Sequence, residues 1–362
     1  SARWIGSGRA EAIPPPHGSS GMIDLIVLPL IKIIFVLTGV LITVMYLVLL
    51  ERKVQAWVQA RLGPMRVGPH GVLQPIADVV KLFVKEDVTP VRAEKWVFTL
   101  APIIVLVPSL IAFAVIPFGP EVNLFGRPVP LYITDLNVGL LYIVSVAAIG
   151  VYGIILGGWS SNSKYPLLGS LRSSAQLISY ELAVTLTFVS VILAAGSLSM
   201  VQIVEAQHAN GVWFAFVQPV ALFIYGVGAL AETNRNPFDL PEAESELVAG
   251  FHTEYSGMRF ALFFLAEYTN MIVVSAVATT LFFGGWLRPF PNVEWLSFLG
   301  LVPAWIWFTL KTFALLYVFL WIRATLPRYR YDQLMQLGWK WLIPLAIANI
   351  VVTAAVKVIL GS

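Results

Sequence analysis

The chain has 362 residues, of which 58% are hydrophobic and only 12% are charged, with a mean hydropathy of +0.81. Soluble domains carry about 25% charged residues, so the composition excludes a soluble enzyme of this length and a disordered or fibrous protein. The net charge is +3 without a basic patch, which argues against a nucleic-acid partner, and the chain has no cysteine. A disulfide and a cysteine-ligated iron–sulfur cluster are therefore excluded.

Eight segments are long and apolar enough to cross the hydrocarbon core as helices, which takes about 20 residues each. They are residues 25–50, 97–117, 136–158, 173–195, 212–231, 260–287, 301–322 and 341–360. They are too long for the strands of an outer-membrane barrel, which need only about 10 residues of alternating polarity. The sequence therefore predicts an all-α polytopic membrane protein with eight transmembrane helices.

The connections between these segments differ strongly in positive charge. The connections 51–95, 159–172, 232–259 and 323–340 contain 16 Lys and Arg residues, whereas the other three contain 2. The positive-inside rule then places the four basic connections in the cytoplasm, or a mitochondrial matrix, and both termini outside. We expect residues 22–362 to form a single membrane domain. Residues 1–21, with three consecutive prolines and no apolar run, are predicted to be an N-terminal extension that is disordered or cloning-derived.

The first cytoplasmic loop contains one segment, 71–87, with apolar residues at the three-and-four spacing of a helix. Charged residues such as Asp78 and Lys81 lie between them. This pattern predicts an amphipathic helix that lies along the bilayer surface. Such a helix is either a structural collar or the frame of an opening through which an apolar molecule enters from the lipid.

Two carboxylates, Glu181 and Glu267, lie inside predicted spans. An ionised carboxylate there costs at least about 2.5–3.5 kcal/mol, so such residues usually face the protein interior and lie on proton or ion paths. Burial and neighbouring carboxylates raise the pKa of such groups, which favours proton exchange near pH 7. The alternative is an inert ion pair with an arginine, and Lys311, inside the seventh span, is a candidate for a buried partner.

The connection 232–259 is unusually acidic, with six carboxylates and only two arginines. Its prolines and interleaved apolar residues favour a folded loop that dips toward the bundle over a solvated turn. The histidines are scattered, and no glycine-rich phosphate loop is present. We therefore expect no metal site and no site for NAD, flavin or haem. These features predict a proton-coupled protein that handles an apolar ligand, with any redox cofactor in another chain.

Five blocks of sequence between residues 22 and 360 resemble one family, the quinone-site membrane subunit of respiratory complex I. This family comprises the H subunit of NADH-quinone oxidoreductase and mitochondrial NADH dehydrogenase subunit 1. The most specific block is 231–246, with the sequence AETNRNPFDLPEAESE, which continues to AEY at 266–268. The others are ERK at 51–53, RLGP to KE at 61–86, GWSSNSKYPLLGSLR to SYE at 158–181, and IRATLPR to RYDQ at 322–333.

The resemblance implies a subunit of a proton-translocating NADH:quinone oxidoreductase, whose loops help form a chamber that quinone enters from the bilayer. The residues that match those lining or electrostatically shaping the chamber are Glu51, Arg52, Arg61, Asp78, Arg235, Phe264 and Arg323. A second set matches the carboxylate chain that passes charge or protons toward antiporter-like subunits. These acids are Glu181, Glu232, Glu242, Glu244, Glu246 and Glu267.

The resemblance also implies what surrounds the chain. Quinone is the substrate, with ubiquinone as one form, and NAD, FMN and iron–sulfur clusters are held by partner subunits. The partners are hydrophilic quinone-site and iron–sulfur subunits on the cytoplasmic side, small membrane subunits and antiporter-like subunits, in a bacterial inner membrane. Two alternatives are a homologous subunit of a membrane-bound hydrogenase, or another-donor complex, and a stand-alone transporter. The absence of an internal repeat between the two halves argues against the transporter.

Overall fold

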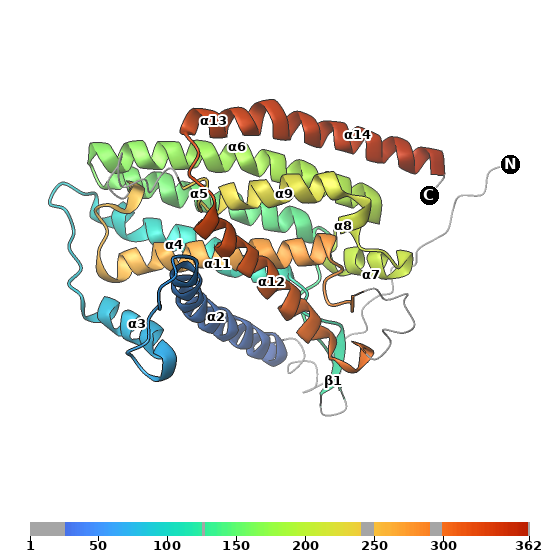
Figure 1. The fold of residues 1–362 in the computed structure, drawn as a ribbon, viewed down its shortest axis with the longest axis horizontal. Helices are drawn as coiled ribbons and strands as arrows, with labels where there is room; N and C mark the ends of the chain where they lie inside the picture. Colours follow the sequence, from blue (N-terminus) through green and yellow to red (C-terminus); the bar gives the residue numbers. More distant parts are fainter. Residues whose placement is uncertain (1–25, 125–126, 240–249, 290–298, 361–362) are drawn as a thin grey trace.

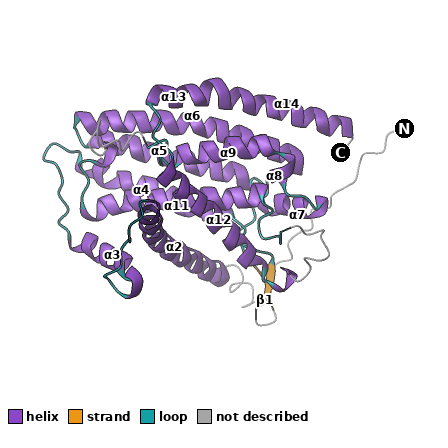
Figure 2. Ribbon diagram, viewed as in Figure 1, coloured by secondary structure: helices purple, strands orange, loops and turns teal. Residues whose placement is uncertain are grey.

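The computed structural model of the chain describes residues 26–124, 127–239, 250–289 and 299–360 (Figure 1). Helices dominate these residues (Figure 2). Two short strands, β1 (Glu121–Leu124) and β2 (Arg127–Pro130), form an antiparallel pair with Val122 opposite Val129. The predicted N-terminal extension, 1–21, and the loop acids Glu242, Glu244 and Glu246 lie outside the described residues.

Within the described part of the chain, seven helical segments are long and apolar enough to cross a membrane. They are α2 (Leu28–Val58), α4 (Lys95–Ile111) with the 3-10 turn η3 (Ala112–Val115), α5 (Gly139–Ser160), α6 (Lys164–Ala195), α11 (Gly257–Phe282), α12 (Ala304–Thr325), and the C-terminal run of α13 (Tyr331–Gln336), a π-helical segment η6 (Leu337–Leu342) and α14 (Ile343–Leu360). The architecture is that of a polytopic membrane protein built from helices.

The fifth predicted span is shorter than expected. The segment 212–231 is divided into α8 (Phe214–Val217) and α9 (Pro219–Glu232), with Gln218 outside helical geometry between them at φ −126° and ψ 55°. Proline lacks an N–H and disfavours the helical conformation of the residue before it, so Pro219 accounts for the break. With 14 residues, α9 is about 21 Å long. The structure therefore has seven long helices and one short apolar helix where eight full spans are predicted.

The connections gather at two ends of the bundle (Figure 1). At one end, backbone groups join the four basic connections: Glu94 N–H donates to Ser160 at 3.2 Å, and Tyr329 N–H donates to Pro237 at 3.0 Å. The Val88 N–H donates to Ser256 Oγ at 2.9 Å at the same end. The other end holds the β-hairpin and α7 (Met200–Asn210). The four basic connections thus form one continuous surface layer.

Several helices continue beyond the apolar segments that predict them. The helix α6 begins at Lys164 rather than at 173, so most of the connection predicted at 159–172 is helical. The helix α2 likewise continues to Val58, into the connection predicted at 51–95. The physical reason is that hydropathy marks the length embedded in lipid, whereas backbone hydrogen bonding continues into polar sequence. This extension places Glu51 on a helix instead of in a loop.

The helix α11 lies at the centre of the bundle, where it packs against α4, α12, α2 and α9. Every residue from Met271 to Phe282 on it is buried. The opposite case is α14, which packs on α6 and leaves most of its apolar surface exposed. The central position of α11 matters because Glu267 and Tyr268 lie on it, within reach of several other helices.

The segment predicted to be amphipathic contains η2 (Pro69–Gly71) and the helix α3 (Gln74–Val84). On α3, Val80, Phe83 and Val84 have 55%, 66% and 81% of their surface exposed. The helix is attached to α2 by an ion pair between Arg52 Nη1 and Asp78 Oδ2 at 2.6 Å. Its position along a bilayer surface stays a prediction.

Candidate functional site

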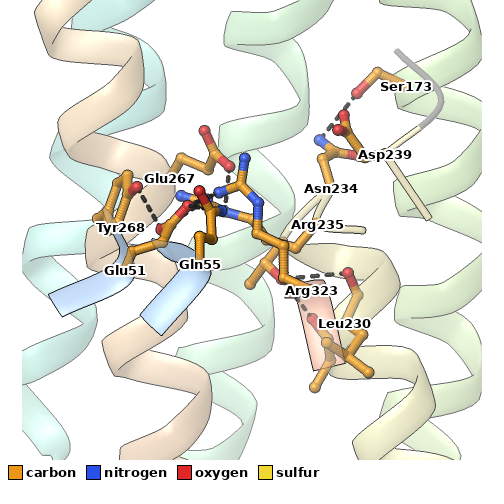
Figure 3. A network of polar contacts seen from close by, with 12 residues as sticks. Glu51, Gln55, Ser173, Leu230, Asn234, Arg235, Asp239, Glu267, Tyr268 and Arg323 are labelled. Atoms are coloured by element: carbon orange, nitrogen blue, oxygen red, sulfur yellow. Dashed lines mark hydrogen bonds and ion pairs between the residues drawn. The ribbon is translucent and has the colours of Figure 1, made fainter. Parts of the chain in front are cut away.

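The site is organised by a tight turn after α9. Arg235 N–H donates to Leu230 C=O and Asn234 N–H donates to Ala231 C=O, both at 3.3 Å. This pair of bonds is the Schellman motif, which needs a residue in the left-handed conformation just after the helix. Asn234 has φ +50° and fills that position, as asparagine tolerates better than most residues. The turn reverses the chain and directs Arg235 back into the bundle (Figure 3).

Arg235 forms the centre of a buried cluster of charges, and only 4% of its surface is exposed. Its Nη1 lies 3.2 Å from Glu51 Oε2 on α2. Its Nε lies 2.6 Å from Glu267 Oε1 on α11. Arg323, at the end of α12, forms a second ion pair with Glu51. Four elements far apart in the sequence therefore meet at this cluster (Figure 3).

Two uncharged side chains complete the cluster. The Tyr268 hydroxyl donates to Glu51 Oε2 at 2.6 Å, and its ring lies under the Arg235 guanidinium with 4.2 Å from Cζ to the ring centroid. Gln55 Nε2 donates to Glu51 Oε1 at 3.3 Å. Glu51, 5% exposed, is thus a buried carboxylate that accepts hydrogen bonds from four side chains, as a buried charge requires.

The cluster balances its charges, with Arg235 and Arg323 opposite Glu51 and Glu267. Burial by itself lowers the pKa of the Arg235 guanidinium. The Glu267 carboxylate, the Tyr268 side chain and the Glu51 carboxylate outweigh burial and raise that pKa above its ordinary value. Arg235 is therefore a permanent cation, and any change in the protonation of its two acidic partners leaves it with excess positive charge.

A cavity of about 120 Å³ lies between α4, α5, α6, α9 and α11. Three acids from three helices line it: Glu181 on α6, Glu232 at the end of α9 and Glu267 on α11. Glu181 and Glu232 interact electrostatically, and neither pairs with a cation among the described residues. The side chains of Asn270 and His252 add polar groups to a lining that is otherwise largely apolar. Water needs polar partners in a cavity, and these side chains supply them.

Glu267 belongs to both arrangements. It lines the cavity together with Glu181 and Glu232, and it forms an ion pair with Arg235 in the charge cluster. The cavity and the cluster are therefore in contact through one carboxylate. A change in charge on either side alters the electrostatic environment of the other, because Coulomb interactions are strong where water is excluded.

The structure separates the residues that the resemblance groups around a quinone. Glu51, Arg235 and Arg323 meet in the cluster, and the Phe264 ring lies 4.6 Å from the Tyr268 ring beside it. Arg52 and Asp78 pair with each other between α2 and α3. Arg61 is exposed and hydrogen bonds to Gln59, so no contact of Arg61 with the cluster is present.

Sequence reasoning missed several participants. Tyr268 follows Glu267 directly, and a phenol in an apolar span generally needs a hydrogen-bond partner, which is a usable signal. Asn234 is a typical residue for the end of a helix. Lys311 has no carboxylate partner: its Nζ donates to the carbonyl oxygens of Phe283, Gly285 and Leu287 beyond the end of α11, at 2.6–3.0 Å. The expectation of a buried partner is met by backbone instead of by an acid.

No group of three His, Asp or Glu side chains that could hold a metal ion is found among the residues that the structure describes. The polar groups of the cluster and the cavity are instead arranged to bind one another, protons or water. They suit charge transfer and recognition of a polar head group.

A profile of the NADH dehydrogenase family matches residues 31–354. One H subunit of NADH-quinone oxidoreductase from Geobacter metallireducens, the one numbered 2, is 55% identical over 337 residues, which cover 90% of this chain and 94% of that protein. The H subunit numbered 1 of the Geobacter sulfurreducens enzyme is 54% identical and covers 90% of this chain and 93% of that protein. The chain belongs to the NADH dehydrogenase family. The family resemblance drawn from the five sequence blocks is thereby confirmed.

Proposed function

We propose that the chain is the membrane subunit of a bacterial proton-translocating NADH:quinone oxidoreductase, at which quinone binding is coupled to a chain of buried carboxylates. Membership of the NADH dehydrogenase family and the names of the Geobacter relatives support the enzyme class. The observation that carries the coupling is the double contact of Glu267, with the acid-lined cavity and with Arg235.

The quinone site in this proposal lies beside the charge cluster. Arg323 is 26% exposed on its side chain, so it is the cation of the cluster best placed to meet a ligand. The aromatic rings of Phe260, Phe264 and Tyr268 follow one another along α11 and offer an apolar surface for a quinone ring. Arg52 and Asp78 act further out, where α3 meets α2.

The coupling follows from electrostatics. Reduction of a quinone near Arg235 and Arg323 draws negative charge and protons to the cluster. The arginines then share their positive charge between the ligand and their carboxylates, and Glu267 is held less strongly as an anion. Proton uptake by Glu267 becomes more favourable, and the cavity connects it to Glu181 and Glu232. The proposal extends this path to the loop acids Glu242, Glu244 and Glu246.

The proposal includes the membrane arrangement expected from the sequence. The α8–α9 segment acts as the eighth span, the four basic connections face the cytoplasm of a bacterial inner membrane, and both termini lie outside. The helix α3 lies on the bilayer surface with its exposed apolar side chains in the lipid. Hydrophilic electron-transfer subunits with NAD, FMN and iron–sulfur clusters bind the basic layer, and small and antiporter-like membrane subunits lie beside the helices.

Purification of a tagged chain in mild detergent, with mass spectrometry of the proteins that accompany it, tests the proposal. We expect iron–sulfur, flavin and antiporter-like subunits, together with inhibitor-sensitive NADH–quinone activity. Recovery with a nickel–iron hydrogenase pair would instead support the hydrogenase alternative. A lone chain that moves a solute in liposomes would support the transporter.

A further inference from the structure

We infer that Gln176 on α6 is a positioning residue that holds Arg235 in the charge cluster. The inference rests on the proposed function, because the cluster matters to turnover only if quinone chemistry takes place beside it. Gln176 has no exposed surface. Its Nε2 donates to Ala231 C=O and to Phe238 C=O, both at 2.9 Å.

These two acceptors lie on opposite sides of Arg235 in the chain. Ala231 is in the last turn of α9, and its carbonyl also accepts the Asn234 N–H of the Schellman turn. Phe238 follows the turn, and its N–H donates to Arg235 C=O at 2.8 Å. A single amide group therefore closes the segment on both sides of the arginine. Loss of that amide leaves two buried carbonyls without this donor, which is costly in a water-free environment.

A second contact on the same face of α6 reinforces this attachment. Ser173, three residues before Gln176 on the helix, accepts a hydrogen bond from Asn234 Nδ2 at 3.1 Å. Asn234 is the left-handed residue that reverses the chain. On the opposite side, Asn236 Nδ2 donates to Arg323 C=O at 3.2 Å. The turn is thus held between α6 and α12, and Arg235 is directed toward α2 and α11.

Gln176 does not touch Glu51, Glu267 or Arg323, so its influence on the cluster passes through the backbone that it holds. This distinguishes a positioning role from a direct one. Removal of the amide should allow the turn to open and Arg235 to occupy several positions. The consequence is a weaker quinone site in a complex that is still assembled.

The test uses the absence of cysteine in this chain, because a single introduced thiol then reports one position. Thr233 lies in the turn and is 2% exposed, so Thr233→Cys places a buried thiol there. The complex that carries it is treated with a maleimide, and label on this chain is counted after separation of the subunits. In the Gln176→Met background we expect labelling to be about tenfold faster, as loss of two hydrogen bonds implies. Methionine keeps the length of the side chain without its donors.

Thr187→Val is the matched control, because Thr187 is also buried on α6 and its hydroxyl donates to Val184 C=O of its own helix. It should leave the labelling rate unchanged. In Gln176→Met without the cysteine, the KM for quinone should rise several-fold, while NADH oxidation by an upstream artificial acceptor stays at the wild-type level. Unchanged labelling at position 233, or equal acceleration by Thr187→Val, would overturn the inference.

If Gln176→Met does not assemble, Ser173→Ala removes only the contact to Asn234 and should accelerate labelling by a smaller factor. No acceleration in that variant would also overturn the inference. The labelling rate requires no turnover, so it decides the role of Gln176 even where the unsubstituted complex lacks NADH–quinone activity. That last result would count against the proposed function alone.

Discussion

Replacement of Glu51 by glutamine tests the charge cluster most directly. The Glu51 and Arg235 side chains are 6% and 5% exposed, so solvent screens their interaction little. The substitution keeps the shape of the side chain but leaves Arg235 and Arg323 opposite the single carboxylate of Glu267. Removal of one partner from a buried ion pair costs about 3–5 kcal/mol, because the remaining charge is uncompensated.

We therefore expect Glu51→Gln to lower the thermal stability of this chain within the purified complex, and to reduce quinone turnover. The assay is thermal denaturation in detergent, followed by loss of NADH–quinone activity and by release of the chain from the complex. Glu51→Gln combined with Arg323→Gln restores charge balance and should recover part of the stability. A coupling of about 0.5–3 kcal/mol between the two substitutions is expected for residues in contact.

The Arg52–Asp78 pair provides the control. Its side chains are 45% and 27% exposed, so water screens the charges, and exposed pairs contribute at most about 1 kcal/mol. Asp78→Asn should therefore leave the denaturation temperature nearly unchanged. If Glu51→Gln denatures at the wild-type temperature, or no more readily than Asp78→Asn, the cluster does not have the energetic role assigned to it.

Four further substitutions have defined outcomes. Glu181→Gln removes a titratable group from the cavity and should abolish proton pumping in an assembled complex, measured with a pH-sensitive dye; wild-type pumping would contradict its role. Arg323→Ala should reduce quinone turnover more than electron transfer to an upstream artificial acceptor, whereas equal losses would indicate failed assembly. Lys311→Met removes three hydrogen bonds to backbone carbonyls and should destabilise the chain by at least about 2 kcal/mol, seen in thermal denaturation; an unchanged midpoint would refute this. An environment-sensitive fluorophore on Phe83→Cys should report lipid in proteoliposomes, while the same label on Lys81→Cys reports water; equal spectra would place α3 away from the bilayer.

The sequence by itself determined the helical membrane architecture and two central acids. Apolar segments of about 20 residues can be stable only where lipid or protein covers them, so hydropathy located the long helices with errors mainly at their ends. The cost of a buried carboxylate singled out Glu181 and Glu267, and the structure places both on one cavity. Hydropathy did not reveal the break at Gln218, because a divided helix has the same composition as a continuous one.

Only the tertiary structure decided which charges meet. Glu51 is separated by 184 residues from Arg235 and by 272 from Arg323, and no local pattern specifies pairs so far apart. The same limit applied to Gln176, whose partners are backbone carbonyls that any residue can supply. Local sequence reports propensity and the energy of transfer into lipid, whereas the partner of each buried polar group depends on how helices pack.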